Sequence, residues 1–107
     1  MNHLMNTKPY YAVIFTSTRT KKDDKGYAEM AQKMEELAKK QEGFLGIETA
    51  KSELGITVSY WKDLRSILRW KKNAEHLQAQ KKGREEWYSW YKIRISLILR
   101  EYDFNKE

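Results

Sequence analysis

The sequence predicts an α+β domain of the ferredoxin-like type, in which the element order βαββαβ forms a four-stranded antiparallel sheet with helices on one face. Three observations predict this fold. Residues 10–18 are rich in β-branched and aromatic side chains, residues 27–41 carry apolar side chains at helical spacing, and residues 91–99 follow an alternating pattern. The segments between them supply a hairpin of two strands and a second helix.

The first strand is expected over residues 10–18, where apolar side chains occur in both alternating sets, so both faces should be covered. The first helix follows over residues 27–41, because apolar residues recur there every three or four positions. Its apolar members are Tyr27, Met30, Ala31, Met34, Leu37 and Ala38. Gly43 is expected to close this helix in the left-handed cap position.

A hairpin and a second helical region are expected in the middle of the chain. Residues 44–50 and 56–61 form the two strands of the hairpin, joined by a short polar turn. Asp63 predicts the N-cap of the next helix. Asn73 predicts a second N-cap, so the helical region is expected to break just before it. Glu48, a polar residue within the hairpin, is expected to face solvent or to pair with a base such as Arg94.

The last strand gives the clearest periodic signal, because residues 91–99 place an all-apolar row on one face and mostly basic residues on the other. The helices of this fold cover one face of the sheet and leave the other bare. That bare face carries apolar residues of the first strand together with Trp90 and Ile98, which favours burial. We therefore expect a homodimer that packs two sheets face to face, with a monomer bearing exposed aromatic side chains as the alternative.

Composition limits the classes of function. The chain has no cysteine, which excludes disulfides and thiolate chemistry and indicates a cytoplasmic location. No apolar run approaches the roughly 18 residues that a membrane span needs, so no membrane partner is expected. The net charge of +6 comes from bases interspersed with acids, which is typical of a solvated surface. No nucleic-acid partner is expected, because residues 56–61 lack the glycine-centred pattern of RNA-recognition strands.

The domain organisation is simple. Residues 1–9 are polar and lack periodicity, which predicts a flexible N-terminal arm. Residues 10–107 are expected to form a single domain, since 107 residues suffice for one core.

Three segments carry a resemblance to a known family. They are Gly43-Phe44-Leu45-Gly46-Ile47-Glu48, then Val58-Ser59-Tyr60-Trp61, and the stretch from Trp70 to Tyr88 that includes Glu75-His76, Ala79-Gln80, Gly83-Arg84 and Trp87. From Tyr10 onward the chain resembles the antibiotic biosynthesis monooxygenase superfamily, and looks like an uncharacterised bacterial branch of it. The resemblance implies a dimeric α/β barrel built from ferredoxin-like chains. It implies function less specifically, because the superfamily contains cofactorless oxygenases, haem degraders and proteins with no known activity.

The resemblance and the residue chemistry together suggest a pocket between helix and sheet. Trp70 lies where the family places a pocket tryptophan, and His76 is a candidate general base or ligand. Asn73 could hold a substrate oxygen or simply cap a helix. Aromatic side chains that could stack on a polycyclic substrate, or equally fill the core, are Trp61, Trp87, Tyr88, Trp90 and Tyr91.

No cofactor is expected. The glycine-rich phosphate loops are absent, and His3 and His76 alone cannot form a two-histidine carboxylate iron site, so no metal site is expected. The resemblance also disfavours haem, because the family's haem-ligating position holds Gln80, and Thr16, Ser17 and Thr18 stand where haem degraders have an asparagine. The leading hypothesis is cofactor-independent oxidation of a small aromatic substrate. A non-catalytic small-ligand-binding or structural dimer is the alternative, and haem binding or degradation is a minor one.

Overall fold

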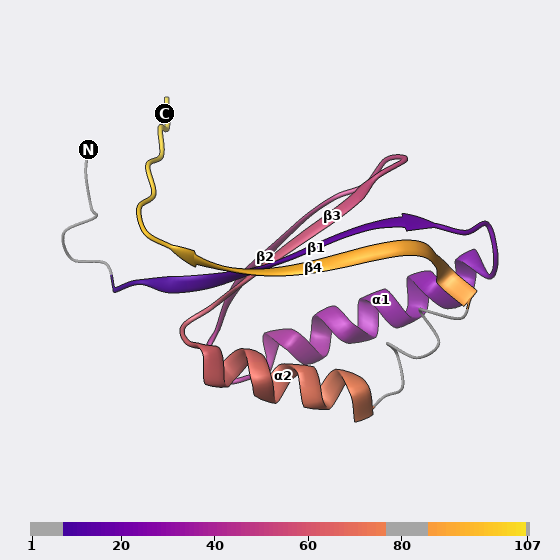
Figure 1. Ribbon diagram of the computed structural model, residues 1–107, viewed down its shortest axis with the longest axis horizontal. Helices are drawn as coiled ribbons and strands as arrows, with labels where there is room; N and C mark the ends of the chain where they lie inside the picture. Colours follow the sequence, from indigo (N-terminus) through magenta and orange to yellow (C-terminus); the bar gives the residue numbers. More distant parts are fainter. Residues whose placement is uncertain (1–7, 77–85, 107) are drawn as a thin grey trace.

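The computed structural model describes residues 8–76 and 86–106, the side chains of Glu75 and His76 excepted. Six elements follow one another: β1 (Tyr10–Arg19), α1 (Asp24–Lys39), β2 (Phe44–Ala50), β3 (Gly55–Trp61), α2 (Leu64–His76) and β4 (Tyr88–Ile98). The four strands form one antiparallel sheet in the order β2-β3-β1-β4, and both helices lie on one side of it (Figure 1). The α+β ferredoxin-like fold is therefore confirmed.

The register assigns each strand residue to one of two faces, because directly paired residues of antiparallel strands point the same way. Tyr11 pairs with Trp61 on β3 and with Leu97 on β4, and these side chains point toward the helices. The neighbouring Ala12 pairs with Tyr60 and Ser96 on the opposite side. We call that opposite side, which neither helix covers, the open face.

The core lies between the helices and the β2-β3-β1 part of the sheet. Trp61 is completely buried there against Ala38 of α1 and Ile67 of α2. Partly buried hydrophobic residues pack around it: Tyr11, Val13, Phe44 and Trp70. The indole nitrogen of Trp61 donates a hydrogen bond to Ser59 Oγ at 2.9 Å, so the ring is buried with its polar atom satisfied.

The turn between α1 and β2 differs from the sequence prediction. Helix α1 ends at Lys39, and its cap residue Lys40 keeps a right-handed conformation. Gly43 does have a left-handed backbone, with φ of 92°, but it lies in the turn beyond the helix and is not its cap. The reason for glycine here is tertiary, because a Cβ would overlap Ser66 Oγ of α2 and lie 2.6 Å from Ser66 Cβ.

Helix α2 begins as predicted but does not break. Asp63 caps it by accepting hydrogen bonds from Ser66 N at 2.8 Å and Ser66 Oγ at 2.7 Å. The helix then continues through Asn73 to His76, so the prediction of a second cap at Asn73 was wrong. Asn73 Nδ2 instead donates to Gln41 Oε1 at 3.0 Å, a bond that leaves the helix backbone undisturbed.

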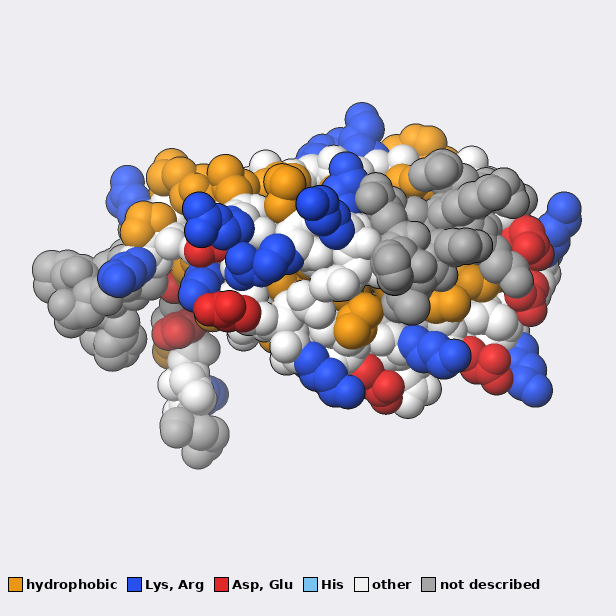
Figure 2. Space-filling view, turned by 90° about the horizontal axis from the view of Figure 1, so that it is seen from below, with side chains coloured by type: hydrophobic (Ala, Val, Ile, Leu, Met, Phe, Trp, Pro, Cys, Tyr) orange, Lys and Arg blue, Asp and Glu red, His pale blue; other side chains and the backbone are white. Residues whose placement is uncertain are grey.

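The all-apolar row of β4 lies on the helix side, yet the helices do not cover it. Ile93, Ile95 and Leu97 remain 43%, 54% and 44% exposed. Helix α1 packs on β2 and α2 packs on β3, whereas β4 forms the far edge of the sheet. Figure 2, seen from the helix side, shows hydrophobic side chains along its upper edge, interspersed with lysine and arginine side chains. On the open face Ile56 and Trp90 are exposed as well. Exposed apolar surface is therefore present on both sides of the sheet.

No helix in the described ranges 8–76 and 86–106 is long and apolar enough to cross a membrane.

Candidate functional site

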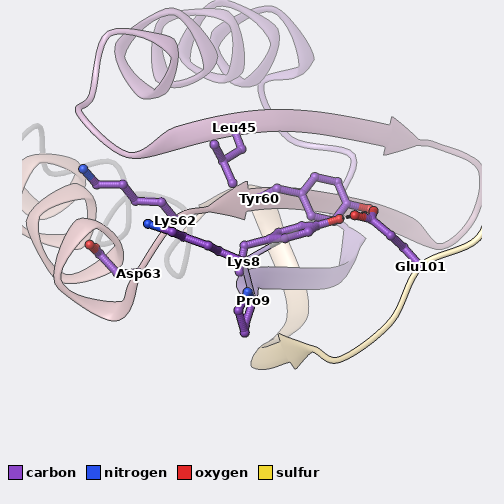
Figure 3. A pocket seen from close by; sticks show the side chains of 8 residues that line it. Lys8, Pro9, Leu45, Tyr60, Lys62, Asp63 and Glu101 are labelled. Carbon is purple, nitrogen blue, oxygen red and sulfur yellow. Dashed lines mark hydrogen bonds between the residues drawn. The ribbon is translucent and has the colours of Figure 1, made fainter. Parts of the chain in front are cut away.

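A pocket of about 700 Å³ lies at one end of the sheet, where β1 begins and β3 ends. Eight residues line it: Lys8, Pro9, Tyr10, Leu45, Tyr60, Lys62, Asp63 and Glu101. They come from the segment before β1, from the strands β1, β2 and β3, from the β3–α2 junction and from the segment after β4 (Figure 3). This volume falls within the range of small-ligand sites, which is roughly 300–1,000 Å³.

Two tyrosines form the aromatic wall of the pocket. Tyr10 and Tyr60 both point to the open face, and their rings meet edge to face with centroids 5.9 Å apart. Tyr10 Oη donates a hydrogen bond of 2.5 Å to Glu101 Oε1, and Tyr60 Oη donates one of 2.7 Å to Glu48 Oε1. Each phenol is therefore held by its own carboxylate.

These carboxylates keep both phenols protonated. The hydrogen bond to Glu101, followed by burial, raises the pKa of Tyr10 to about 12. The hydrogen bond to Glu48 likewise raises the pKa of Tyr60 above its ordinary value. At neutral pH the two hydroxyls act as hydrogen-bond donors, so neither tyrosine can serve as a general base there.

The pairing of Glu48 corrects one expectation. Glu48 bonds to Tyr60 on the neighbouring strand and not to Arg94. Glu48 and Arg94 do lie on the same cross-strand row, through Val58 and Ile14. Because β2 and β4 are the two edges of the sheet, three strand spacings of about 4.8 Å separate their backbones. An ion pair across that span is too long to form.

The other end of the pocket holds two lysines and one carboxylate, which are Lys8, Lys62 and Asp63. Figure 3 shows Lys8 and Lys62 extending to the end of the pocket where Asp63 lies, while Tyr60 points toward Glu101 at the opposite end. Lys62 Nζ lies 3.7 Å from Glu42 Oε2, which is too long for a hydrogen bond. Asp63 is occupied by Ser66, and these hydrogen bonds hold the pKa of its carboxyl below the usual value.

The aromatic residues predicted for the substrate pocket fall into two groups. Trp61 and Trp70 stack with ring centroids 6.0 Å apart, within the core below the start of β1. Trp87 and Tyr91 lie near the end of β1, where Tyr91 packs on Phe15 at 5.4 Å and Trp87 is buried. Tyr91 pairs with Ser17 and Trp61 with Tyr11, so six residues of β1 separate the groups. That separation is about 20 Å.

Neither of the two polar candidates on α2 is among the described residues that line the pocket. Asn73 is engaged by Gln41. His76 ends α2, but its side chain lies outside the described residues. Helix α2 begins at Leu64, next to the pocket residue Asp63, and His76 lies twelve residues further along it. Twelve residues of α-helix span about 18 Å, so the backbone of His76 lies about that far from the start of the helix. Within the described part of the chain, no three metal-ligating side chains come together.

Sequence reasoning missed the pocket residues themselves. Tyr10 and Tyr60 could have been found, because the predicted topology pairs the first strand with the third and puts both tyrosines at one end of the same face. Lys8 and Pro9 were assigned to the N-terminal arm, yet they line the pocket. Glu101 carried no signal, since it lies beyond the last strand in a segment without periodicity.

The fold and the site define a class: a small ferredoxin-like protein with an aromatic pocket at one end of the open face. The model of the family described as antibiotic biosynthesis monooxygenase matches residues 9–82. Since this is more than half of its length, the chain belongs to the antibiotic biosynthesis monooxygenase family. It is also 44% identical over 95 residues to "Uncharacterized protein YqjZ" of Bacillus subtilis (strain 168), a match covering 87% of this chain and 82% of that protein.

Solved structures agree on the fold. SnoaB of Streptomyces nogalater, a cofactor-independent oxygenase solved as a mutant, superposes with a TM-score of 0.66 at 10% identity. That match covers 94% of this chain and all of SnoaB. PA3566 of Pseudomonas aeruginosa superposes with a TM-score of 0.67 at 17% identity, over 82% of this chain and 92% of that one. At these identities the similarity establishes the fold alone.

Proposed function

We propose that this protein binds a small hydroxylated aromatic compound in the Tyr10–Tyr60 pocket and oxidises it without an organic cofactor. The observation that supports the proposal is a pocket of about 700 Å³ whose aromatic walls carry two phenols fixed by carboxylates. Membership of the monooxygenase family supplies the class of reaction. The likeness to SnoaB, named as a cofactor-independent oxygenase, supports the absence of an organic cofactor.

The chemistry requires the substrate to supply its own electrons. A ring CH₂ conjugated with a ring carbonyl, as in a hydroxylated anthrone, loses a proton, and the resulting enolate anion reduces O₂. One oxygen atom then replaces the two hydrogens as a ketone, and the other leaves with those hydrogens as water, so no external reductant is consumed. We assign Glu101 as the proton acceptor, because its carboxylate lines the pocket. Its Oε1 atom accepts one hydrogen bond, from Tyr10, which leaves the carboxylate able to accept a proton.

The pocket also supports binding without turnover. Both tyrosines stay protonated at neutral pH, and a carboxylate is a weak base for a carbon acid. A non-catalytic ligand-binding protein of the same fold is therefore the second candidate. Haem degradation remains the minor hypothesis, and a hemin titration without a Soret shift would remove it.

We further propose that the protein is a homodimer formed by the open faces of two sheets. Apolar side chains on this face support the proposal: Ile14, Ile56, Val58 and Trp90. The pocket opens on the same side, because Tyr10 and Tyr60 belong to the open face. A second copy would thus exclude water from the pocket, which oxygen chemistry on an anion requires.

Oxygen uptake with a panel of hydroxylated anthrones tests the catalytic proposal. Wild-type protein should consume O₂ with at least one of them, and Glu101→Gln should lose most of that rate while still binding the compound. His76→Ala is the matched control and should retain the rate. Binding without O₂ uptake would favour the non-catalytic candidate, and loss of rate in His76→Ala alone would move the site to the C-terminal end of α2.

A further inference from the structure

The pocket has two chemically different ends, and this difference points to a ligand class. At one end the hydroxyls of Tyr10 and Tyr60 are bonded to Glu101 and Glu48. At the other end Lys8 and Lys62 extend beside Asp63 (Figure 3). The middle is apolar, formed by Pro9, Leu45 and the tyrosine rings.

The two carboxylates near the lysines, Asp63 and Glu42, already have partners within the protein. The ammonium groups of the two lysines still have N–H groups that can donate hydrogen bonds to a ligand. Asp63 accepts two hydrogen bonds from Ser66, which fixes it as the cap of α2. Glu42 approaches Lys62 at 3.7 Å, both groups being at least half exposed, so this pair leaves the three ammonium hydrogens available. Lys8 makes no ion pair with any side chain that the structure describes, in residues 8–74 and 86–106.

From this arrangement we infer that the pocket selects a flat aromatic acid that carries a hydroxyl at the end opposite its carboxylate. Lys8 and Lys62 bind the carboxylate, and the rings of Tyr10 and Tyr60 contact the aromatic body. The hydroxyl donates a hydrogen bond to the Glu101 carboxylate. The inference rests on the proposed use of this pocket and adds the substrate class and its two specificity-determining lysines.

Calorimetric titration of the full chain with three matched probes tests the inference: a hydroxynaphthoate, the naphthol that lacks its carboxylate, and the naphthoate that lacks its hydroxyl. Hydroxynaphthoate should bind more tightly than either of the others. Lys8→Met and Lys62→Met should each weaken its binding roughly fivefold, the effect of one exposed ion pair, and leave naphthol binding unchanged. Added salt should reduce the preference for the acid in wild-type protein.

Two controls separate the inference from the proposed function. Lys25→Met removes an exposed lysine at the start of α1 and should leave all three affinities unchanged. Glu101→Gln should lower the preference for hydroxynaphthoate over naphthoate without altering the lysine effects. Equal binding of hydroxynaphthoate and naphthol to wild-type protein, or lysine variants with wild-type affinity for the acid, overturns the inference alone. Failure of all three probes to bind overturns the proposed use of the pocket as well.

Discussion

Trp61 shows how one residue can combine a structural position with a place next to the site. It is the largest completely buried side chain among the described residues, and it stacks on Trp70 and meets Phe44 edge to face at 5.5 Å. Its neighbour Tyr60 points the other way, into the pocket. Alternation along β3 thus separates the core from the site by one residue.

Replacement of Trp61 should be among the most damaging single changes. Trp61→Ala leaves a cavity among Ala38, Ile67 and Trp70, and we expect it to lower the free energy of unfolding by about 3–5 kcal/mol. Leu68→Ala is the matched control, because Leu68 is 56% exposed on α2 and should change stability by less than about 1 kcal/mol. Urea unfolding followed by tryptophan fluorescence and circular dichroism measures both.

Tyr10 should make stability depend on pH in the alkaline range. Because its folded-state pKa is about 12, above the ordinary value of 10.0, the protonated phenol stabilises the fold below about pH 10. This contribution should be lost as the pH rises through about 12. Urea unfolding at a series of alkaline pH values should show a steeper loss of stability for wild-type protein than for Tyr10→Phe. Equal slopes would mean that the bond to Glu101 does not form in solution.

At the scale of elements, the α1–β2 turn and the start of α2 hold each other in place. Gly43 approaches Ser66 so closely that a side chain cannot fit, and Ser66 in turn bonds to the cap residue Asp63. The carbonyl of Gly43 also accepts a hydrogen bond of 2.8 Å from Lys62 N. The pocket residues Lys62 and Asp63 are therefore positioned by this turn.

Gly43→Ala should be far more costly than another glycine replacement in the adjoining strand. The backbone of residue 43 has a φ of 92°, which alanine disfavours, and the new Cβ would overlap Ser66. We therefore expect Gly43→Ala to lower the free energy of unfolding by more than about 1 kcal/mol. In Gly46→Ala the new Cβ would meet only the Tyr60 ring at 3.8 Å, an ordinary contact, so stability should be nearly unchanged. Thermal unfolding of the two variants compares them, and similar melting temperatures would contradict the tight approach.

The continuity of α2 gives a prediction for its two capping candidates. Asp63→Ala removes the hydrogen bond that Asp63 accepts from Ser66 N and should lower the free energy of unfolding, as the loss of an N-cap does. Asn73→Ala removes only an exposed bond to Gln41 and improves helix propensity, so it should be neutral or slightly stabilising. Urea unfolding of the two variants measures the difference. A larger loss for Asn73→Ala would restore a cap at that position.

For the whole molecule, the assembly decides whether the pocket is closed. Sedimentation equilibrium at micromolar concentration should give a mass twice the 12.9 kDa of one chain. Trp90→Lys places a charge on the open face and should shift the protein toward monomers, whereas Leu68→Lys, on α2, should not. If Leu97→Lys on the helix side disrupts the dimer and Trp90→Lys does not, the uncovered row of β4 is the interface.

The same two surfaces show where sequence patterns reach their limit. The alternation in β4 correctly assigns Ile93, Ile95 and Leu97 to one face, and that face does point toward the helices. Alternation does not say whether a helix lies over that strand. Because β4 is an edge strand and the helices pack on β2 and β3, the row stays exposed.

The sequence by itself determined the order and type of the six elements, the cap at Asp63 and the resemblance to the family, because these depend on local periodicity and on short motifs. Only the tertiary structure decided which residues meet at the pocket. Tyr10 and Glu101 are 91 positions apart, and their contact follows from strand order and register. The physical reason is that packing of the entire sheet sets the register, whereas each strand's own pattern records only which side of it is apolar.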